Sequence, residues 1–193
     1  ASDADVISFQ EVSPQWAEAL VNGLSATYPY HIAEPRTNCY GIALFSRLPF
    51  MSAQVISLQG TPAVDARINT AQGPVRLLAV HAESPGSYGS FQRRNAQLEQ
   101  LAGVIGDGEE PTVLLGDLNT VSWDQALRRL CKRSQLVEGQ EAGAATWPSA
   151  WGLALIPIDH VLVSPGLGVR ALQPFHIPGS DHRGLVAQLT RTR

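Results

Sequence analysis

The sequence has few of the basic residues that mark a nucleic-acid-binding surface. It contains a single lysine, Lys132, its net charge is −3, and no run of basic residues is longer than two. Its densest basic cluster lies within one short segment, where a solvated helix face is a better explanation than a nucleic-acid patch. That cluster consists of Arg128, Arg129, Lys132 and Arg133.

Cysteines and long apolar runs are also scarce. Only Cys39 and Cys131 are present, far apart and without metal-binding spacing. They form either one disulfide or, as we prefer, two buried free thiols. No segment reaches the length of a transmembrane helix and no signal peptide opens the sequence, which leaves the location open. The motifs of serine hydrolases, P-loop proteins and dinucleotide-binding proteins are missing.

The sequence does contain a regular succession of apolar segments. No repeat or linker divides residues 1–193, which are enough for one domain with a substantial core. Three segments predict helices, the first capped by Ser13 and the last opened by Ser122 and Gln125 as a capping box; they span 14–26, 91–105 and 122–130. The other segments favour an α/β (α+β) fold with mixed sheets. These nine predicted strands are 6–9, 40–45, 55–58, 63–70, 75–80, 112–115, 158–163, 169–175 and 184–189.

Polar residues follow several of the predicted strands, most clearly after 112–115. Asp117 and Asn119 come next, two residues apart, so a continuing strand would point both side chains to one face. They would also suit a turn. Since Ser122 already supplies a helix cap, we favour a functional role for the pair.

Two acid–imidazole pairs lie further along the chain. Asp159 and His160 interrupt an apolar strand, so one side chain points inward and the other outward, and each needs a partner. Asp181 and His182 follow a Pro-Gly-Ser turn. Placed beside Asp159, His182 would have the carboxylate partner that a general base or a phosphate-polarising group requires.

Three further polar residues could act at the same place. Glu11 ends the first strand, where it could also serve the start of the next helix. His81 ends strand 75–80, and Arg67, on the polar face of strand 63–70, could bind a phosphate with both guanidinium nitrogens. Surface roles explain His81 and Arg67 equally well. Carboxylate and amide oxygens suit Mg²⁺ or Mn²⁺ better than Zn²⁺.

Taken in order, these motifs resemble the endonuclease/exonuclease/phosphatase superfamily, which has the deoxyribonuclease I-like fold. The similarity runs from about residue 3 to residue 190. Within the superfamily, the sequence resembles a bacterial branch of uncharacterised members. It implies a four-layer sandwich of two mixed β-sheets flanked by helices. It also implies metal-dependent hydrolysis of a phosphoester by in-line attack of water. The motifs are Gln10-Glu11, His81, Gly116-Asp117-Leu118-Asn119, Asp159-His160 and Gly179-Ser180-Asp181-His182.

The resemblance also implies residue roles. Glu11 would bind the metal, and Asp181 would lie beside the metal or the water. Asp117 and Asn119 would orient water and phosphate, while Asp159 would hold His182 in its working tautomer. The scissile phosphate would be contacted by Arg67, His81 and Asn119.

One departure from the family pattern concerns the start of the fold. Members carry a strand upstream of the glutamate with an asparagine that helps to bind metal, but only ten residues precede Glu11. We therefore expect a domain that lacks its first strand and is weakly active until that strand is restored. The alternative is a degenerate, non-catalytic module that binds phosphate or protein.

The substrate class stays open at this point. A nucleic acid, a phospholipid headgroup and a small phosphoester are all compatible with the motifs, and the acidic charge argues slightly against a processive nucleic-acid binder. The sequence indicates no protein partner. The resemblance to the bacterial branch implies a membrane-spanning segment upstream of this sequence, which would tether the domain to a membrane.

Overall fold

The computed structural model describes residues 3–107, 110–139, 144–149 and 154–192. Within these residues it has three helices: α1 (Pro14–Leu24), α2 (Tyr88–Ile105) and α3 (Gln125–Ser134). None of them has the length and apolar composition needed to cross a membrane. The strands are β1 (Val6–Gln10), β2 (Tyr30–Glu34), β3 (Ile42–Ser46), β4 (Phe50–Leu58), β5 (Thr61–Thr70), β6 (Gly73–His81), β7 (Thr112–Asp117), β8 (Val137–Glu138), β9 (Asp159–Val163), β10 (Leu167–His176) and β11 (Arg183–Arg191).

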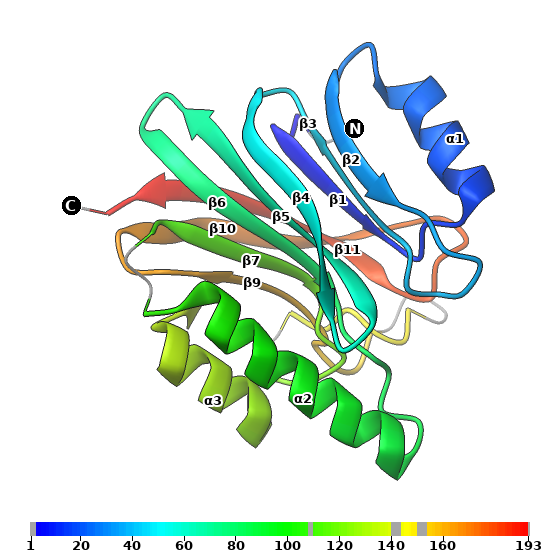
Figure 1. Cartoon of the computed structure of the whole chain (residues 1–193), viewed down its shortest axis with the longest axis vertical. Coiled ribbons are helices and arrows are strands. Elements are labelled where there is room, and N and C mark those ends of the chain that lie inside the picture. The colour runs from blue at the N-terminus through cyan, green and yellow to red at the C-terminus, as the bar shows by residue number, and fades with distance from the viewer. Residues whose placement is uncertain (1–2, 108–109, 140–143, 150–153, 193) are drawn as a thin grey trace.

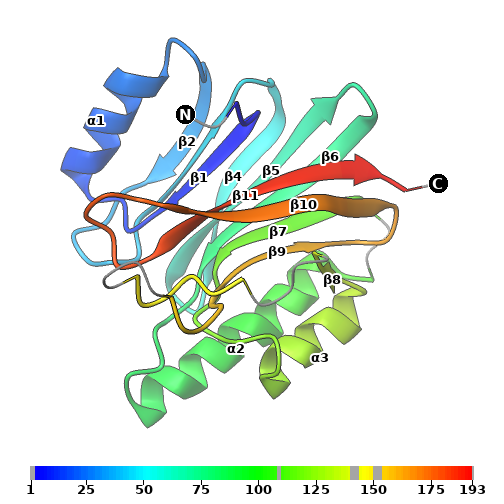
Figure 2. The same cartoon turned by 180° about the vertical axis from the view of Figure 1, so that it is seen from behind.

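The elements form four layers, as the sequence predicts. A six-stranded mixed sheet of order β4-β5-β6-β7-β9-β8 faces a second layer made of the β1-β3-β2 sheet and the β10-β11 hairpin. Helices α2 and α3 cover the outer face of the six-stranded sheet, and α1 covers the outer face of the three-stranded sheet (Figures 1 and 2). The predicted α/β sandwich flanked by helices is therefore confirmed. Only the six-stranded sheet is mixed, however, because all strand pairs described in the second layer are antiparallel.

Three apolar cores hold the four layers together. The alternation predicted for residues 63–70 places Val64, Ala66 and Ile68 in the core between the two sheets. A second core joins the six-stranded sheet to α2 and α3, and a third joins α1 to the three-stranded sheet. Strand periodicity thus decides which side chains face the opposing sheet and which face the helices.

Helix α2 connects the parallel strands β6 and β7. This connection brings the carboxyl ends of both strands together at one end of the large sheet. Strands β6 and β7 pair in parallel, with His81 opposite Asp117, and β9 pairs antiparallel to β7, with Asp159 opposite Asp117. The carboxyl ends of β6 and β7 therefore meet the amino end of β9 at one place. This end of the sheet carries three of the predicted site residues, His81, Asp117 and Asp159, in a single row.

The helix starts differ from prediction in two of three cases. Ser13 caps α1 as expected, accepting from the Trp16 amide at 3.2 Å. Helix α2 begins three residues early because Ser87 and Ser90 form a capping box. The predicted cap at Ser122 is wrong, because Asp124 caps α3 instead. The Ser122 hydroxyl donates to Glu138 at 3.0 Å, which leaves the cap to the next acceptor along the chain.

The surface of α3 and the two cysteines bear on other sequence predictions. The basic cluster of α3 is exposed along its whole length, as expected of a solvated helix face; it consists of Arg128, Arg129, Lys132 and Arg133. Both cysteines are free, but Cys39 is exposed and Cys131 is only partly buried. The expectation of two buried thiols is therefore wrong, most clearly for Cys39.

A long trough separates the two parts of the second layer. Its cavity measures about 1340 Å³, with β1 along one wall and β11 along the other. Apolar residues of the six-stranded sheet form its floor, among them Ile68, Leu77 and Val113. Among the described strands, β1 pairs only with β3 and β11 only with β10, so each turns one edge toward the trough.

A buried ion pair stabilises the end of the six-stranded sheet farthest from the row of site residues. Arg76 on β6 donates through Nε and Nη2 to both carboxylate oxygens of Asp65 on β5, each at 2.9 Å, and through Nη1 to the carbonyl of Val104 at 3.1 Å. Burial alone would raise the pKa of Asp65, but the hydrogen bonds and charge of Arg76 hold it below its ordinary value. The carboxylate is therefore charged and depends on Arg76.

We predict that Arg76→Met lowers the free energy of unfolding by about 3–5 kcal/mol, because it leaves a buried carboxylate without its cation. Urea denaturation followed by far-UV circular dichroism measures the loss. The double variant Arg76→Met/Asp65→Leu should recover most of it, since both charges are then removed. As a control, Arg67→Met removes a half-exposed ion pair with Glu110 and should cost at most about 1 kcal/mol. A single variant as stable as wild type would contradict the prediction.

Candidate active site

The candidate site is built on the row that crosses β6, β7 and β9. Its members His81, Asp117 and Asp159 are register partners on adjacent strands, and they share a strand face with inter-sheet core residues. They therefore point toward the second layer, where they line the trough at one end. Asp117 lies centrally, with its carboxylate Oδ2 3.5 Å from His81 Nε2.

The turn after β7 orients the Asp117 carboxylate. Asn119 adopts a left-handed backbone conformation with φ of 49°, which asparagine tolerates better than most residues. Its backbone amide donates to Asp117 Oδ1 at 2.7 Å, and its side-chain Nδ2 donates to Asp117 Oδ2 at 3.2 Å and to the Ala82 carbonyl at 2.9 Å. These contacts orient the Asp117 carboxylate, and the contact of Asn119 with phosphate stays a prediction.

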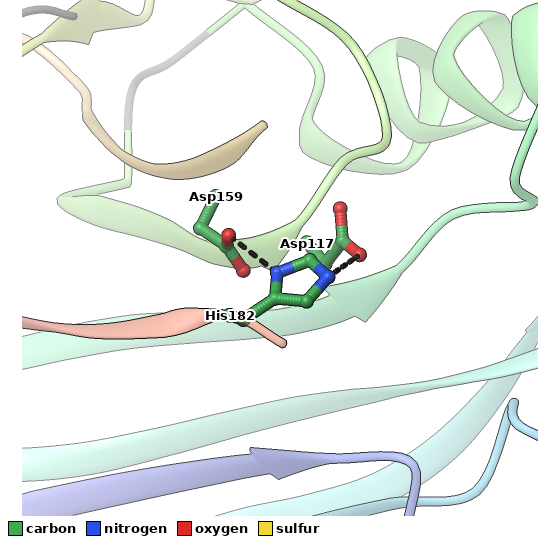
Figure 3. A group of neighbouring side chains, drawn as sticks. All are labelled: Asp117, Asp159 and His182. Carbon is green, nitrogen blue, oxygen red and sulfur yellow. Dashed lines mark hydrogen bonds and ion pairs between the residues drawn. The ribbon is translucent and has the colours of Figure 1, made fainter. Parts of the chain in front are cut away.

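His182 completes the site from the turn before β11. Its Nδ1 lies 2.9 Å from Asp159 Oδ2 and its Nε2 lies 3.9 Å from Asp117 Oδ2, so the ring stands between the two carboxylates (Figure 3). Thr146 holds the two sides together, since its hydroxyl accepts from the Asp159 amide and its carbonyl accepts from the Arg183 amide. The structure thus brings His182 beside Asp159, as the sequence predicts.

The neighbouring strand residue His160 points the opposite way. Its ring is buried on the helix side of the sheet, with Nδ1 2.7 Å from Glu138 and Nε2 2.8 Å from the Thr120 carbonyl. The expectation that Asp159 and His160 face opposite sides, each with a partner, is therefore confirmed.

The environments of the two site histidines separate their pKa values. Burial lowers the pKa of His81 to about 4, so its ring is neutral near pH 7. Burial also acts to lower the pKa of His182, but the hydrogen bond and charge of Asp159 outweigh it and raise that pKa to about 9. Burial, followed by the negative charge of Asp159, raises the pKa of Asp117 to about 7. A neutral imidazole and an imidazolium therefore flank a carboxyl group that titrates near neutrality.

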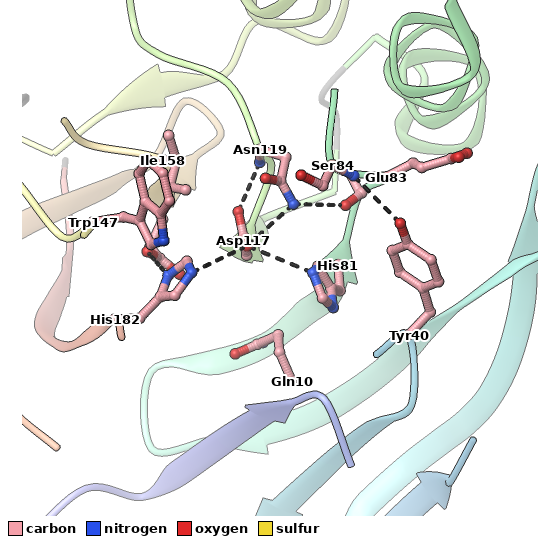
Figure 4. Close-up of polar contacts among 12 residues, drawn as sticks. Gln10, Tyr40, His81, Glu83, Ser84, Asp117, Asn119, Trp147, Ile158 and His182 are labelled. Atoms are coloured by element: carbon pink, nitrogen blue, oxygen red, sulfur yellow. Dashed lines mark hydrogen bonds and ion pairs between the residues drawn. The ribbon is translucent and has the colours of Figure 1, made fainter. Parts of the chain in front are cut away.

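Sequence reasoning missed two side chains at this site. The ring of Tyr40 lies 5.2 Å from that of His81, and its hydroxyl accepts from the Ser84 amide at 3.4 Å. Gln10 reaches in from β1 on the facing sheet, with Nε2 close to the backbone of Gly116 (Figure 4). Gln10 belongs to a motif of the family resemblance, but neither side chain is ionised at neutral pH, so a pattern of charged residues does not reveal them.

Glu11 and Asp181 line the same cavity outside the central group. Glu11 follows β1 in a left-handed conformation with φ of 59°, and its side chain is exposed. Asp181 is also exposed, and its Oδ2 accepts from the indole of Trp147 at 3.2 Å.

Arg67 is not part of this site, which corrects its prediction as a phosphate ligand. Its register partner is Arg76, which pairs with Thr112 at the start of β7. Arg67 therefore lies at the opposite end of the sheet from Asp117. Its guanidinium donates to both carboxylate oxygens of Glu110, at 2.7 and 2.9 Å. The sequence identified a polar strand face correctly but could not reveal this partner.

The donors around the cavity fit a divalent cation. In the described part of the chain, Asp117, Asp159 and His182 form the one group of acidic or imidazole side chains whose ligand atoms all lie within 4.8 Å of one another. Glu11 and Asp181 add two more carboxylates to the lining. Such hard oxygen donors suit Mg²⁺ or Mn²⁺. The raised pKa of Asp117 also marks a place where negative charge lacks compensation.

We predict that the metal-free protein loses stability as pH rises from 6.5 to about 9. Because the pKa of His182 is raised from 6.5 to about 9 on folding, its contribution is fully present below pH 6.5 and is lost through pH 9. The shift corresponds to at most about 3 kcal/mol, and solvent screening of the half-buried ring reduces this value. The raised pKa of Asp117 acts in the same direction up to pH 7. Urea denaturation in the presence of EDTA at the two pH values measures the difference.

The matched variant for this prediction is Asp159→Asn, which removes the carboxylate that raises the His182 pKa. In that variant the loss of stability above pH 6.5 should largely disappear, and the pKa of His182 measured by NMR should fall below about 7. An unchanged pH dependence would contradict the assignment of the Asp159–His182 pair. His81 does not interfere, because its lowered pKa affects stability only below pH 6.5.

Comparisons with known proteins agree with this architecture. The structure resembles an endonuclease/exonuclease/phosphatase from Beutenbergia cavernae with a TM-score of 0.76 and 22% identity, covering 97% of this chain and 62% of that one. It resembles D. rerio TDP2 complexed with a single-strand DNA product with a TM-score of 0.76 and 17% identity, covering 96% and 86% of the two chains. For a Staphylococcus aureus beta toxin variant with bound magnesium ions the values are 0.68, 15%, 95% and 86%.

At these identities the structural matches establish the fold alone, and this chain spans 62% of the length of the B. cavernae protein. No relative was found among curated proteins. The sequence itself matches a family model, since residues 1–182 fit the pattern of the Endonuclease/Exonuclease/phosphatase family. The chain belongs to the Endonuclease/Exonuclease/phosphatase family.

Proposed function

We propose that this protein hydrolyses a phosphoester, in particular a phosphodiester, by in-line attack of water with the help of a divalent metal ion. The observation that carries the proposal is that Asp117 lies between two histidines of opposite protonation. Near pH 7 His81 is neutral, with a pKa of about 4, and His182 is cationic, with a pKa of about 9. Phosphoester hydrolysis needs both a cation for the phosphoryl oxygens and a base for the water.

Asp117 is a better candidate for the general base than His182 or Asp181. Its pKa of about 7 lies near the working pH, where a base is most effective. His182 is already protonated at that pH. Asp181 is exposed and already accepts a hydrogen bond from Trp147. The hydrogen bonds from Asn119 would keep the Asp117 carboxylate aimed at the attacking water.

His182 and His81 would contact the phosphoryl group. Because Asp159 engages Nδ1 of His182, its Nε2 is the atom that would donate to a phosphoryl oxygen. Neutral His81 offers a second nitrogen on the other side of Asp117. Although Asp117, Asp159 and His182 lie close together, a cationic His182 bonded to Asp159 offers no ligand atom, so the metal ion would be held by the other carboxylates of the cavity, Glu11 and Asp181. When bound, Mg²⁺ or Mn²⁺ supplies positive charge for the phosphoryl oxygens and the leaving group.

A non-catalytic module that binds a phosphorylated ligand is the competing proposal. Four buried or half-buried titratable groups at one site are costly to maintain unless they have a function. The separated pKa values of His81 and His182 also match what acid–base chemistry needs. These features favour an enzyme, and a turnover assay distinguishes the two cases, because a binding module would retain its ligand without cleaving it.

We predict metal-dependent turnover that requires both Asp117 and His182. The substrates to compare are bis-p-nitrophenyl phosphate, single-stranded DNA, plasmid, RNA, phosphoinositides and sphingomyelin, each with Mg²⁺, Mn²⁺ or Ca²⁺. Asp117→Asn and His182→Gln should each lower kcat by about 10²–10⁴-fold, and EDTA should abolish turnover. The control His31→Gln alters an exposed histidine outside the cavity and should leave kcat unchanged. Full activity in both site variants would refute the proposal.

We also propose that the complete fold has one more strand, which occupies the trough between β1 and β11. The two strand edges that face the trough and its apolar floor support this, because such edges and floors normally bind a neighbouring strand. The site residues line one end of the trough, so an inserted strand would close the site on that side.

The prediction that follows concerns activity with and without such a strand. The 193-residue chain alone should be weakly active, and a protein extended upstream of residue 1 by a strand-forming segment should be at least about tenfold more active, because a misplaced site loses rate steeply. A scrambled segment of the same composition is the control. Full metal-dependent turnover by the 193-residue chain alone would contradict the proposal.

A further inference from the structure

Two buried basic side chains outside the catalytic row contact the backbone of the turn that carries Asp117 and Asn119. We propose that Arg94 on α2 and His160 on β9 are positioning residues, which fix this turn from behind by binding two successive carbonyl groups. The proposal rests on the proposed function, in which Asp117 is the general base. Neither residue was among the site residues that the sequence predicts.

Arg94 binds the first carbonyl. Its Nη1 donates to the Asn119 carbonyl at 3.2 Å, and its Nη2 donates to Asp124 Oδ2, also at 3.2 Å. Only 2% of Arg94 is exposed. The other carboxylate oxygen of Asp124 accepts from the Ala126 amide at the start of α3. One guanidinium therefore joins α2, the cap of α3 and the turn.

His160 binds the second carbonyl. Its Nε2 lies 2.8 Å from the Thr120 carbonyl, and because a carbonyl can only accept, Nε2 is the donor. Its Nδ1 lies 2.7 Å from Glu138 Oε1, which also accepts from Ser122. Like Arg94, His160 is 2% exposed, on the face of the large sheet that packs against the helices.

These contacts act on the backbone that determines where Asp117 points. The Leu118 amide donates to the Ile158 carbonyl at 3.0 Å, and the Asn119 amide donates to Asp117 Oδ1. The Asn119 side chain also donates to Asp117 Oδ2, and the left-handed conformation of Asn119 sets the direction of that side chain. Rotating the peptides that follow would break the contacts with Arg94 and His160. The two side chains therefore favour the one backbone conformation in which Asn119 orients the carboxylate.

Stability alone is a weak explanation for the ion pair of buried Arg94 with Asp124 and for the buried hydrogen bonds of His160. Replacing a buried ion pair by apolar residues of similar volume is often neutral or stabilising. The chain also provides a matched case remote from the site, since the Arg76–Asp65 pair is similarly buried at the other end of the sheet. Arg76 pairs in register with Thr112, five positions before Asp117, or ~16 Å along the strand. Comparing the two arginines separates a positional role from a general one.

The first experiment is amide hydrogen exchange measured by NMR on Arg94→Lys, which keeps the charge but loses the second donor. The amides of Leu118 and Asn119 should exchange at least about tenfold faster than in wild type, relative to Val113 in the same strand, because opening of the turn is local. In Arg76→Lys this ratio should stay unchanged. The readout does not depend on any substrate, so it tests the positioning role even if the proposed activity is wrong.

The second experiment measures kinetics on a phosphodiester such as bis-p-nitrophenyl phosphate. Arg94→Lys should lower kcat about 10- to 100-fold with KM within about twofold, because a misdirected base costs rate rather than binding. Arg76→Lys should change neither constant. His160→Leu should behave like Arg94→Lys, whereas His160→Gln, which keeps a donor near the Thr120 carbonyl, should recover most of kcat.

Two results would overturn the inference. One is unchanged exchange at Leu118 and Asn119 in both Arg94→Lys and His160→Leu. The other is an equal loss of kcat in Arg94→Lys and Arg76→Lys, which would show a general effect of weakening a buried ion pair. If wild type shows no turnover on any substrate, the proposed function fails, and the exchange data alone decide on the positioning role.

Discussion

The parallel pairing of β6 with β7 is the constraint on which the rest of the site depends. It exists because α2 returns the chain across one face of the sheet, so the carboxyl ends of both strands lie together. His81 and Asp117 then become neighbours by register, and the antiparallel β9 adds Asp159 to the same row. Thirty-five residues of chain separate His81 from Asp117, yet their relative position is set by backbone hydrogen bonds.

The row would be an unstable arrangement of charges without its surroundings. Burial raises the cost of ionising Asp117, and the nearby charge of Asp159 adds to that cost. His182 relieves it from outside the row, because its imidazolium contacts both carboxylates. A site of this kind is held together by charge as well as by packing, and its protonation states are coupled to its geometry.

Much of this arrangement could be predicted from the sequence, and the failures have specific physical causes. Strand ends and face alternation follow from residue periodicity, which is a local property. The Asp159–His182 pairing, between residues 23 apart, was implied by the family resemblance. The prediction that Arg67 binds phosphate was wrong because its partner Glu110 is 43 residues away, and no local pattern reveals such a partner. The predicted cap of α3 was wrong because Ser122 and Asp124 are both good caps. The Ser122 hydroxyl binds Glu138, so Asp124 caps the helix. Strand β2 was missed because its short sequence, Tyr30–Glu34, has little apolar alternation.

The trough between β1 and β11 has a consequence for how this chain behaves among other copies of itself. Two strand edges that turn toward an open, apolar channel offer backbone donors and acceptors to any extended segment that reaches them. A neighbouring molecule can supply such a segment as well as the chain's own sequence can. Concentration and temperature therefore become variables of folding for this protein, since self-association and correct closure of the sheet compete for the same edges.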